Sequence, residues 1–270
     1  MVKVVIITGA SAGMGATTAK YLSDRGYHVY GASRRAETGR EKDGFIELKM
    51  DVTDETSVQQ AIHFVIDKEG KIDALVNNAG LGLIGSIEDT SDAEAKAIFE
   101  TNVFGLMNVS RSVLPHMREA QSGYIINISS IAGRMGLPYR GIYSATKASV
   151  LMITEATSSE VRQFGIHVCS ILPGDFKTSV NENRNVVQNA SKSVYSQTTQ
   201  ALNNQVNEEV DHSSDPIIIA RKVEQILRTA KPKMQYMVAQ PIPKLSTVLH
   251  YLLPGRWYER ILMNHYKIKS

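Results

Sequence analysis

Short apolar runs alternate with longer segments of helical period along most of this chain of 270 residues. The runs are nearly continuous and rich in β-branched residues, and they cover residues 4–7, 27–32, 45–50, 74–77, 124–129, 167–172 and 236–238. Helical spacing is found at residues 16–25, from the N-cap at residues 51–54 through residue 66, at about 92–117, around 143–163, and from 217 to about 229. Strands without polar alternation are buried on both faces, which is typical of a parallel sheet covered by helices. The alternation therefore predicts an α/β fold, with a doubly wound parallel sheet and helices on both faces in a single domain.

The bulk composition limits the function classes. With 43% hydrophobic and 21% charged residues, the chain can bury a sizeable core. The formal net charge of +3 comes without a dense stripe of Lys and Arg, so nucleic acid is not an expected partner. The one cysteine, Cys169, lies in an apolar run and is expected to be a buried thiol rather than a nucleophile. No disulfide can form within the chain, and no signal peptide or membrane-spanning run is visible, so we expect a cytoplasmic protein.

A glycine-rich turn at residues 8–15 joins the first predicted strand to the first predicted helix. Without side chains at Gly13 and Gly15, a pyrophosphate could approach the backbone, and the helix N-terminus would supply unpaired N–H groups. This strand–turn–helix context is the one that dinucleotide binding requires. No Gly-Lys-Ser/Thr follows, so the turn is not a P-loop of the nucleoside triphosphate type. The residues expected to contact the dinucleotide here are Gly9, Ser11, Gly13, Met14 and Gly15.

Tyr143 and Lys147 stand four residues apart in a predicted helix, so their side chains share one helix face. A positive charge beside a phenol favours the phenolate and lowers its pKa from the ordinary value of about 10. Such a tyrosine can donate and accept a proton near neutral pH. The spacing alone is weak evidence, because it arises by chance on many helices, and its meaning depends on the other motifs of the chain.

Together with further motifs, this pair resembles the short-chain dehydrogenase/reductase family, in its short one-domain branch. The resemblance rests, in chain order, on T-G-x-x-x-G-x-G at residues 8–15, Asn77-Asn78-Ala79-Gly80, Asn102, Ser130, Tyr143-x-x-x-Lys147, and Pro173-Gly174 followed by Thr178. The interval of thirteen residues between Ser130 and Tyr143 also matches the family. The resemblance covers residues 4 to about 178. It implies a Rossmann-type fold and an NAD(P)-dependent oxidoreductase that interconverts a carbonyl and an alcohol.

The resemblance also implies a role for each catalytic residue. Tyr143 would be the general acid/base, and Lys147 would lower the pKa of Tyr143 and hold the hydroxyls of the nicotinamide ribose. Ser130 would hydrogen-bond the substrate oxygen; Ser129 competes for this role, and the thirteen-residue spacing favours Ser130. Asn102 would anchor a water that links Lys147 to solvent, unless it only bends its helix. The chemistry needs no metal, and the seven scattered histidines contain no H-x-x-x-H pair, so no metal site is expected.

The choice between the two nicotinamide cofactors depends on the end of the second predicted strand. An acidic residue about 20 positions after the glycine loop normally holds the ribose 2′-hydroxyl of NAD. Here that region is Ser33, followed by Arg34 and Arg35. A neutral serine beside Arg34 leaves room for a 2′-phosphate and offers a guanidinium to bind it. We therefore predict NADP(H) rather than NAD(H), although Ala12 stands where many NADP-binding members carry a basic residue, and both arginines could be solvated loop charges.

Further cofactor contacts follow from the resemblance. Asp51 matches the family's adenine-contacting acid, with Val52 beside it, and Asp51 could also be the N-cap of the helix that follows. The backbone of Asn78, Ala79 and Gly80 would line the cofactor. Pro173 and Gly174 would face the nicotinamide, and Thr178 could reach its carboxamide.

Two segments lie outside these motifs. Residues 181–212 are crowded with Asn, Gln, Ser and Val and have only a weak helical pattern, so we expect either a substrate lid or a solvated surface excursion. Residues 241–270 form an apolar and basic extension that Pro254-Gly255 divides into two helices at most. Three roles for the extension stay open: a contact between subunits or a packed flap, a wall of an apolar substrate pocket, and, least favoured, a weak contact with a membrane surface.

The predicted function is the NADP(H)-dependent interconversion of a ketone or aldehyde and an alcohol, with reduction as the expected direction. The substrate could be lipid-, steroid- or retinoid-like, or a 3-oxoacyl compound, and residues 81–87 and 131–140 are expected to select it together with the insertion and the extension. The family resemblance implies a homodimer or homotetramer. The alternative is a non-catalytic regulator that binds NADP(H), which the presence of Ser130, Tyr143 and Lys147 disfavours.

Overall fold

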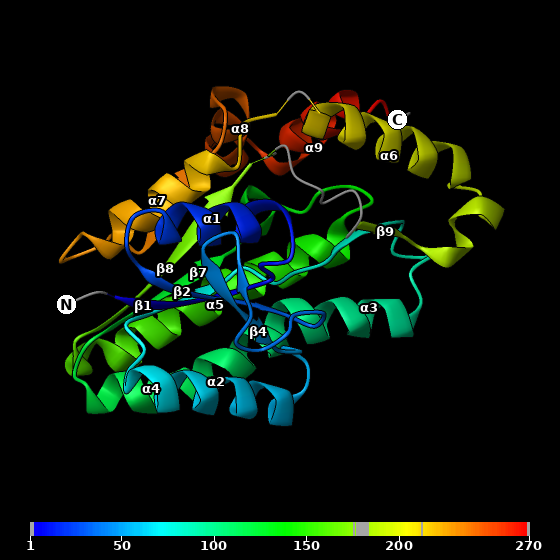
Figure 1. Ribbon diagram of the computed structural model, residues 1–270. Coiled ribbons are helices and arrows are strands. Elements are labelled where there is room, and N and C mark those ends of the chain that lie inside the picture. The colour runs from blue at the N-terminus through cyan, green and yellow to red at the C-terminus, as the bar shows by residue number, and fades with distance from the viewer. Residues whose placement is uncertain (1–2, 175, 177–183, 212, 269–270) are drawn as a thin grey trace.

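Within residues 3–174, 176, 184–211 and 213–268, which the computed structural model describes, eight strands form one sheet in the order β10-β8-β7-β5-β1-β2-β4-β3 (Figure 1). Their bounds are β1 (Val4–Thr8), β2 (His28–Ser33), β3 (Glu41–Lys42), β4 (Phe45–Lys49), β5 (Ala74–Asn77), β7 (Gly123–Ile128), β8 (Ile166–Pro173) and β10 (Gln235–Val238). Every neighbouring pair is parallel except β3–β4. The predicted parallel sheet is confirmed, and the antiparallel edge strand β3, which is exposed and has no apolar pattern, was not predicted.

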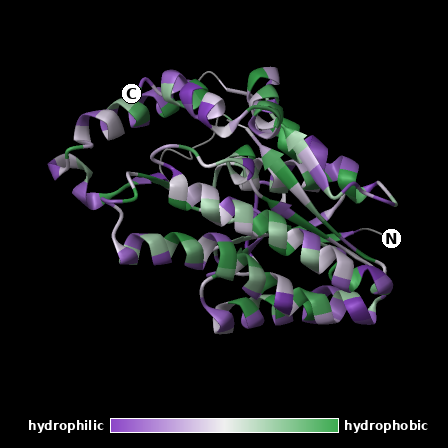
Figure 2. Cartoon of the chain, turned by 180° about the vertical axis from the view of Figure 1, so that it is seen from behind, coloured by the Kyte–Doolittle hydropathy of each residue, from purple (hydrophilic) through white to green (hydrophobic). Residues whose placement is uncertain are grey.

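Helices cover both faces of this sheet, as the continuous apolar runs predict. Helices α1 (Gly13–Ser23) and α7 (Ile217–Leu227) pack on one face, and α2 (Glu55–Glu69), α4 (Leu106–Glu119) and α5 (Gly141–Val161) pack on the other (Figure 1). Strand β1 shows why no polar alternation is possible, because Val5 and Ile7 belong to one core and Val4 and Ile6 to the other. In Figure 2 hydrophobic colour runs through the central strands, while the surrounding helices alternate between hydrophobic and hydrophilic residues.

The order of the strands creates a crevice beside β1. From β1 the chain moves to β2 and β4 in one direction, and it then returns to build β5, β7, β8 and β10 on the other side. In open α/β sheets, ligands bind outside the carboxyl ends of the strands at the point where this direction reverses. Here the reversal lies between β1 and β5, so the segments that follow Thr8 and Asn77 meet at the crevice.

The helix predicted over residues 92–117 is interrupted. Helix α3 (Asp92–Phe99) begins with a capping box at Ser91 and Glu94, and it continues into a π-helical segment, η1 (Glu100–Gly105), before α4 begins. A π-helix lacks the ordinary hydrogen-bonding pattern of an α-helix and is frequent at functional sites. The apolar residues on the two sides of η1 belong to different clusters, Ile98 and Phe99 to one and Val109 and Val113 to another.

The insertion predicted at 181–212 contains regular structure within the residues described. Strand β9 (Arg184–Val186) pairs in parallel with β6 (Gly82–Ile84), and the short helix η5 (Gln188–Lys192) leads to α6 (Ser196–Asp211). Leu202 and Val206 of α6 are buried, so this helix packs on the domain rather than standing in solvent.

The C-terminal extension folds into α8 (Pro241–Leu252) and α9 (Gly255–His265), which lie along the upper edge of Figure 1. The chain breaks between them at Pro254 and Gly255, as the sequence predicts. One side of this pair is buried: Tyr258 and Tyr266 belong to an apolar cluster with Met135, Leu137 and other buried residues. Within the described part of the chain, no helix is both long and apolar enough to cross a bilayer.

Candidate active site

The turn between β1 and α1 favours glycine at three positions. Gly9 and Gly13 have φ angles of 69° and 57°, in the left-handed region that disfavours other residues. A Cβ atom on Gly15 would lie 2.3 Å from the carbonyl oxygen of Gly9, so the turn and the first helical residues are in direct contact. Ala12 precedes α1 without a side-chain cap, and the N–H groups at this helix end therefore face the crevice as an anion site.

Asn78, directly after β5, holds this turn in place. Its Nδ2 donates to the carbonyl oxygens of Thr8 at 2.9 Å and Gly9 at 3.2 Å. In return, the Thr8 hydroxyl oxygen accepts from the backbone N–H groups of Asn78 and Ala79, both at 3.0 Å. From the sequence we expected only the backbone of Asn78 to matter, whereas its side chain also links two loops across the crevice.

The loops enclose a cleft of about 710 Å³. Its lining brings together most of the residues predicted to contact the cofactor and most of those predicted to be catalytic: Gly9, Ser11, Gly13, Met14, Ser33, Arg34, Asp51, Val52, Asn78, Ala79, Gly80, Ser130, Tyr143, Lys147, Pro173 and Gly174. Gly15 and Asn102 are not in the lining; the first supports the turn and the second is buried behind it. Thr178 lies outside the described residues. One cleft thus contains the predicted dinucleotide contacts and the predicted proton donor.

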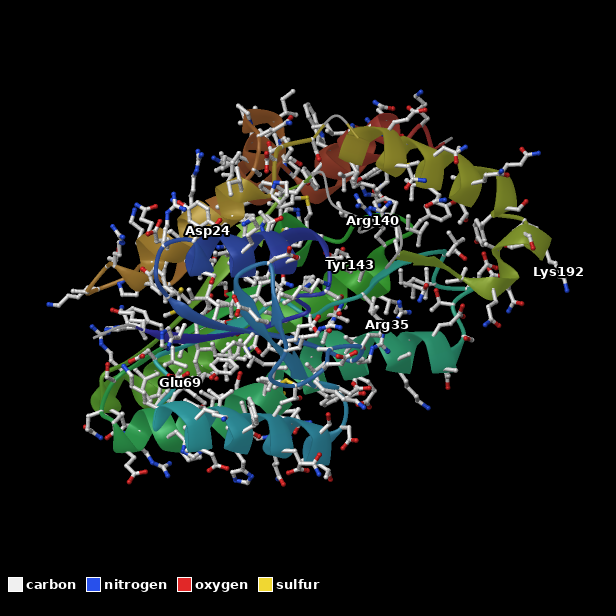
Figure 3. The ribbon with its side chains drawn as sticks, viewed as in Figure 1. Asp24, Arg35, Glu69, Arg140, Tyr143 and Lys192 are labelled. Atoms are coloured by element: carbon white, nitrogen blue, oxygen red, sulfur yellow. The ribbon has the colours of Figure 1, made fainter. Side chains whose placement is uncertain are left out.

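Tyr143 and Lys147 lie one turn apart at the start of α5, with the Lys147 Nζ atom 5.8 Å from the centre of the Tyr143 ring. Figure 3 shows Tyr143, with Arg140 near it, between the C-terminal helices above and α3 below. Lys147 is only 6% exposed, and its Nζ donates to the carbonyl oxygen of Ile128 at 3.0 Å. Burial lowers the pKa of Lys147 to about 8, because the charged ammonium is removed from water. The lysine is therefore still mainly protonated at pH 7.

The two neighbouring serines at the end of β7 have different surroundings. Ser129 is 3% exposed, and its hydroxyl donates to the carbonyl oxygen of Lys147 at 2.8 Å, which joins the end of the strand to α5. The Ser130 hydroxyl oxygen accepts from the N–H group of Ala132 at 3.1 Å, an arrangement that leaves its proton directed elsewhere. This geometry agrees with the spacing argument that favours Ser130 as the residue that contacts substrate.

Asn102 is buried in the π-helical segment, and its side chain is fully engaged by protein groups. Its Nδ2 donates to the Leu81 carbonyl and to the Thr146 hydroxyl, both at 3.0 Å, and its Oδ1 accepts from the Leu81 N–H at 2.7 Å. These bonds join η1, the loop after β5 and the helix that bears Tyr143. The side chain therefore positions three cleft segments relative to one another.

The predicted adenosine end of the cleft contains Ser33, Arg34 and Asp51. Arg34 is exposed and follows directly after β2, where the sequence predicts a group for a 2′-phosphate. The N-cap of α2 is Asp54, not Asp51, because the Asp54 carboxylate accepts from two backbone N–H groups of the first turn. Asp51 instead accepts from the backbone and the hydroxyl of Thr53, at 3.0 and 2.7 Å, and lines the cleft.

Comparison with known proteins decides the family. The model of the short chain dehydrogenase family matches residues 3–189. The chain belongs to this family. This short-chain dehydrogenase is 46% identical over 185 residues to 3-ketodihydrosphingosine reductase of Bacteroides thetaiotaomicron, an alignment that covers 68% of each protein.

Two solved structures support the same assignment. A short-chain dehydrogenase from Streptomyces avermitilis has a TM-score of 0.78 and 28% identity, with 99% of this chain and 96% of that one covered. ElxO with NADP bound has a TM-score of 0.71 and 25% identity, with 88% and 97% covered. The predicted family and Rossmann-type fold are confirmed, and the short-chain dehydrogenase is an NAD(P)-dependent oxidoreductase that acts on CH–OH groups.

Several residues of this short-chain dehydrogenase line the cleft without any motif that marks them. Leu81–Ile84, Arg140 and, from the insertion, Arg184 and Val210 fall in segments that we expected to select the substrate. Glu100 and Phe176 do not belong to a recognised pattern. Glu100 could have been noted from its place two residues before Asn102. Arg184 and Val210 are brought to the cleft by β9 and α6, and no local signal in the sequence predicts the β6–β9 pairing.

Proposed function

We propose that the protein reduces a ketone or aldehyde with NADPH, with Tyr143 as the general acid. The balanced reaction is carbonyl plus NADPH plus a proton giving alcohol plus NADP⁺. The observation that carries the proposal is the position of Tyr143, Lys147 and Ser130 in the same cleft as the glycine turn at the start of α1. The proton donor and the dinucleotide site would then serve one reacting carbon.

The glycines of the cleft fit a nicotinamide dinucleotide. A Cβ atom on Gly80 would stand 3.2 Å from Asn102 Oδ1 and 3.5 Å from Lys147 Nζ, so the bare backbone leaves the space beside Lys147 open. The turn before α1 and the N-terminus of this helix would hold the pyrophosphate. Asp51 and Val52 would contact the adenine, and Pro173 and Gly174 would contact the nicotinamide. When bound, the nicotinamide supplies the hydride.

The protein's own part is to fix one oxygen atom and supply one proton. The Ser130 hydroxyl would donate a hydrogen bond to the carbonyl oxygen and hold it beside the Tyr143 hydroxyl. As negative charge develops on that oxygen, Tyr143 would give it a proton. The Lys147 ammonium, held by the Ile128 carbonyl, favours the phenolate that remains. Proton transfer from solvent would then restore the phenol.

We propose NADP(H) over NAD(H) because Ser33 and Arg34 line the cleft at the end of β2, where an NAD-binding protein would carry a carboxylate to hold the ribose. Solved neighbours bind either cofactor, so the comparisons do not decide this point. Replacing Arg34 by Asp should lower kcat/KM for NADPH by about tenfold to a hundredfold, since a charge-assisted bond to the phosphate is lost, and should favour NADH. An unchanged preference for NADPH would remove Arg34 from the proposal.

A lipid-like carbonyl is the substrate class that we favour. Around Tyr143, an apolar cluster brings together Ile84, Met135 and Leu137 with residues of α6 and α9, namely Leu202, Val206 and Tyr258. The Bacteroides relative is named as a reductase of a long-chain ketone, 3-ketodihydrosphingosine. The insertion, whose Arg184 and Val210 line the cleft, would then be its lid, with the extension packed behind the apolar cluster.

The test is a panel of carbonyl substrates, with NADPH oxidation followed by absorbance. The panel should include 3-ketodihydrosphingosine, a 3-oxoacyl thioester and a short ketone, and the long-chain ketone is expected to have the highest kcat/KM. Tyr143→Phe should lower kcat by about 10²- to 10⁴-fold, whereas Tyr251→Phe, at an exposed tyrosine of α8, should leave kcat unchanged. Full turnover by Tyr143→Phe would refute the assigned role.

A homo-oligomer is a further part of the proposal. Phe104 in η1 and Met152 in α5 are more than half exposed, and both belong to the helical layer around α4 and α5. Apolar side chains of this size on a helix layer are typical of contacts between subunits. Light scattering should show a dimer or tetramer, and Met152→Glu should lower its mass.

A further inference from the structure

The C-terminal helices have a second apolar side that faces solvent. Seven large apolar residues of α8 and α9 are between 44% and 81% exposed, and we call them the outer face: Ile242, Leu245, Val248, Tyr251, Leu252, Trp257 and Ile261. Along α8 the exposed residues recur at the spacing of one side of a helix, and Trp257 and Ile261 are one turn apart on α9. Exposed large apolar side chains gathered on one side of a helix pair mark an interaction site.

The outer face is presented by an ordered element. On the opposite side of the same helices, Thr247, Tyr258 and Tyr266 are at most 7% exposed. The hydroxyls of Ser246 and Tyr258 form a hydrogen bond of 2.9 Å, and Arg140 donates to the Tyr266 hydroxyl at 2.8 Å. Since the helices are fixed from below, the exposure of the outer face does not result from a loose tail.

Basic residues surround the outer face. Lys244 lies beside the apolar stripe of α8, Arg256 and Arg260 lie beside Trp257 on α9, and Lys267 follows α9; all four are exposed. Over residues 241–268, which the structure describes throughout, the one carboxylate is Glu259. Aromatic residues with lysine and arginine around an aliphatic stripe are the side chains found where a helix lies at a lipid–water boundary.

We propose that the outer face docks on an anionic lipid bilayer, with α8 and α9 lying in the plane of the interface. The apolar stripe would enter the boundary between headgroups and acyl chains, and the four cations would meet lipid phosphates. Helices of this length and composition cannot cross a bilayer, so the contact is peripheral. A second copy of the chain fits less well, because a two-fold contact through this face would bring the same cations together.

Docking would also place the cleft next to the membrane. Arg140 lines the cleft and is held by Tyr266, so the helices that bear the outer face also support the cleft near Tyr143. A lipid-like substrate held in the bilayer would then lie close to the protein that reduces it. This consequence rests on the proposed function, whereas docking itself does not.

The chain contains a built-in probe, because Trp257 in the outer face is its one tryptophan. The full-length protein is titrated with vesicles of phosphatidylglycerol and phosphatidylcholine, and separately with vesicles of phosphatidylcholine alone. We expect the Trp257 emission to shift to shorter wavelength and the protein to sediment with the anionic vesicles, with at least tenfold weaker binding to the neutral ones. Vesicle binding and turnover are separate readouts, so failure of the proposed function would not affect this result.

Variants keep the probe and test the face. Leu245→Glu, which places a charge in the apolar stripe, should weaken binding to anionic vesicles by about tenfold or more. Arg256→Glu combined with Arg260→Glu should do the same, since each basic residue near an anionic surface adds to the binding free energy. Lys68→Glu, on the distant helix α2, should bind like the wild type. The proposal is overturned if the wild type ignores anionic vesicles, or if Leu245→Glu binds them normally. It is also overturned if Leu245→Glu instead halves the mass of a soluble wild-type assembly that ignores vesicles, since the face would then join two copies.

Discussion

Replacing Lys147 by methionine should make the protein more stable at pH 7 while removing its activity. The Lys147 ammonium is buried, and its pKa falls from 10.5 to about 8. Each tenfold change in a protonation equilibrium corresponds to about 1.4 kcal/mol, so burying this charge destabilises the native state by about 3 kcal/mol at pH 7. Methionine has a similar length and no charge, but it loses the hydrogen bond to Ile128, which contributes about 1 kcal/mol. The net gain expected for Lys147→Met is about 2 kcal/mol.

The extra stability of Lys147→Met over the wild type should decrease as the pH rises above 8. Below pH 8 both the folded and the unfolded wild type hold the proton on Lys147, so the difference between the proteins is constant. Between pH 8 and 10.5 the unfolded chain binds a proton that the native protein does not, and the free energy of unfolding of the wild type therefore rises with pH. Lys147→Met lacks this titration, so its advantage of about 2 kcal/mol should vanish at about pH 9.5, and the wild type should be the more stable protein by about pH 10.5.

Urea unfolding of the cofactor-free proteins at pH 7 and at pH 10 measures this effect. With an m value of about 3 kcal/mol/M, the midpoint at pH 7 should rise by about 0.7 M. Lys231→Met serves as the control, because Lys231 is exposed and its removal should change neither the midpoint nor its pH dependence. The reasoning is wrong if Lys147→Met is no more stable than the wild type at pH 7, or if the difference stays constant through the titration window.

Three further outcomes follow from the geometry of the site. Gly15→Ala, whose new Cβ would lie 2.3 Å from a loop carbonyl, should bind NADPH at least tenfold more weakly, a loss of about 1.4 kcal/mol that calorimetry can measure. Gly255→Ala is the control: its new Cβ would have no neighbour within 4 Å, so it should bind NADPH like the wild type. Ser130→Ala should lower kcat by about 10²- to 10³-fold with little change in urea midpoint. Ser129→Ala should instead lower the free energy of unfolding by about 1 kcal/mol. A large loss of kcat in Ser129→Ala and a loss of stability alone in Ser130→Ala would exchange the roles of the two serines. Burial raises the pKa of the Cys169 thiol to about 12, so iodoacetamide should label it only after unfolding, even at pH 10, as mass spectrometry can check.

The sequence predicts well those parts of the fold that local chemistry determines. The apolar runs place the strands of the parallel sheet within one or two residues, since a strand buried on both faces must be apolar throughout. The glycine turn is equally visible, because the positive φ angles of Gly9 and Gly13 favour glycine and the contact between Gly9 and Gly15 leaves no room for a side chain on Gly15. Most of the predicted site residues accordingly line one cleft.

Features that depend on distant contacts could not be predicted. The π-helical segment at Asn102 owes its stability to hydrogen bonds with Leu81 and Thr146, which are far away in the sequence. The pairing of β6 with β9 joins two three-residue strands across about a hundred residues, and neither has an alternating pattern of its own. The polar composition of α6 likewise conceals a helix that is ordered by only a few buried side chains, among them Leu202 and Val206.

The short β6–β9 ladder has a thermodynamic consequence. Strand β6 begins two residues after Gly80, a cleft residue beside Lys147, and β9 begins the described part of the insertion that we propose as the lid. A ligand that stabilises the backbone around Gly80 would therefore also stabilise the strand to which the insertion is paired. Such coupling is reciprocal: if the dinucleotide raises the affinity for a substrate held by the insertion, that substrate raises the affinity for the dinucleotide by the same factor. The two ligands of the enzyme would then bind cooperatively although they need not touch at this point.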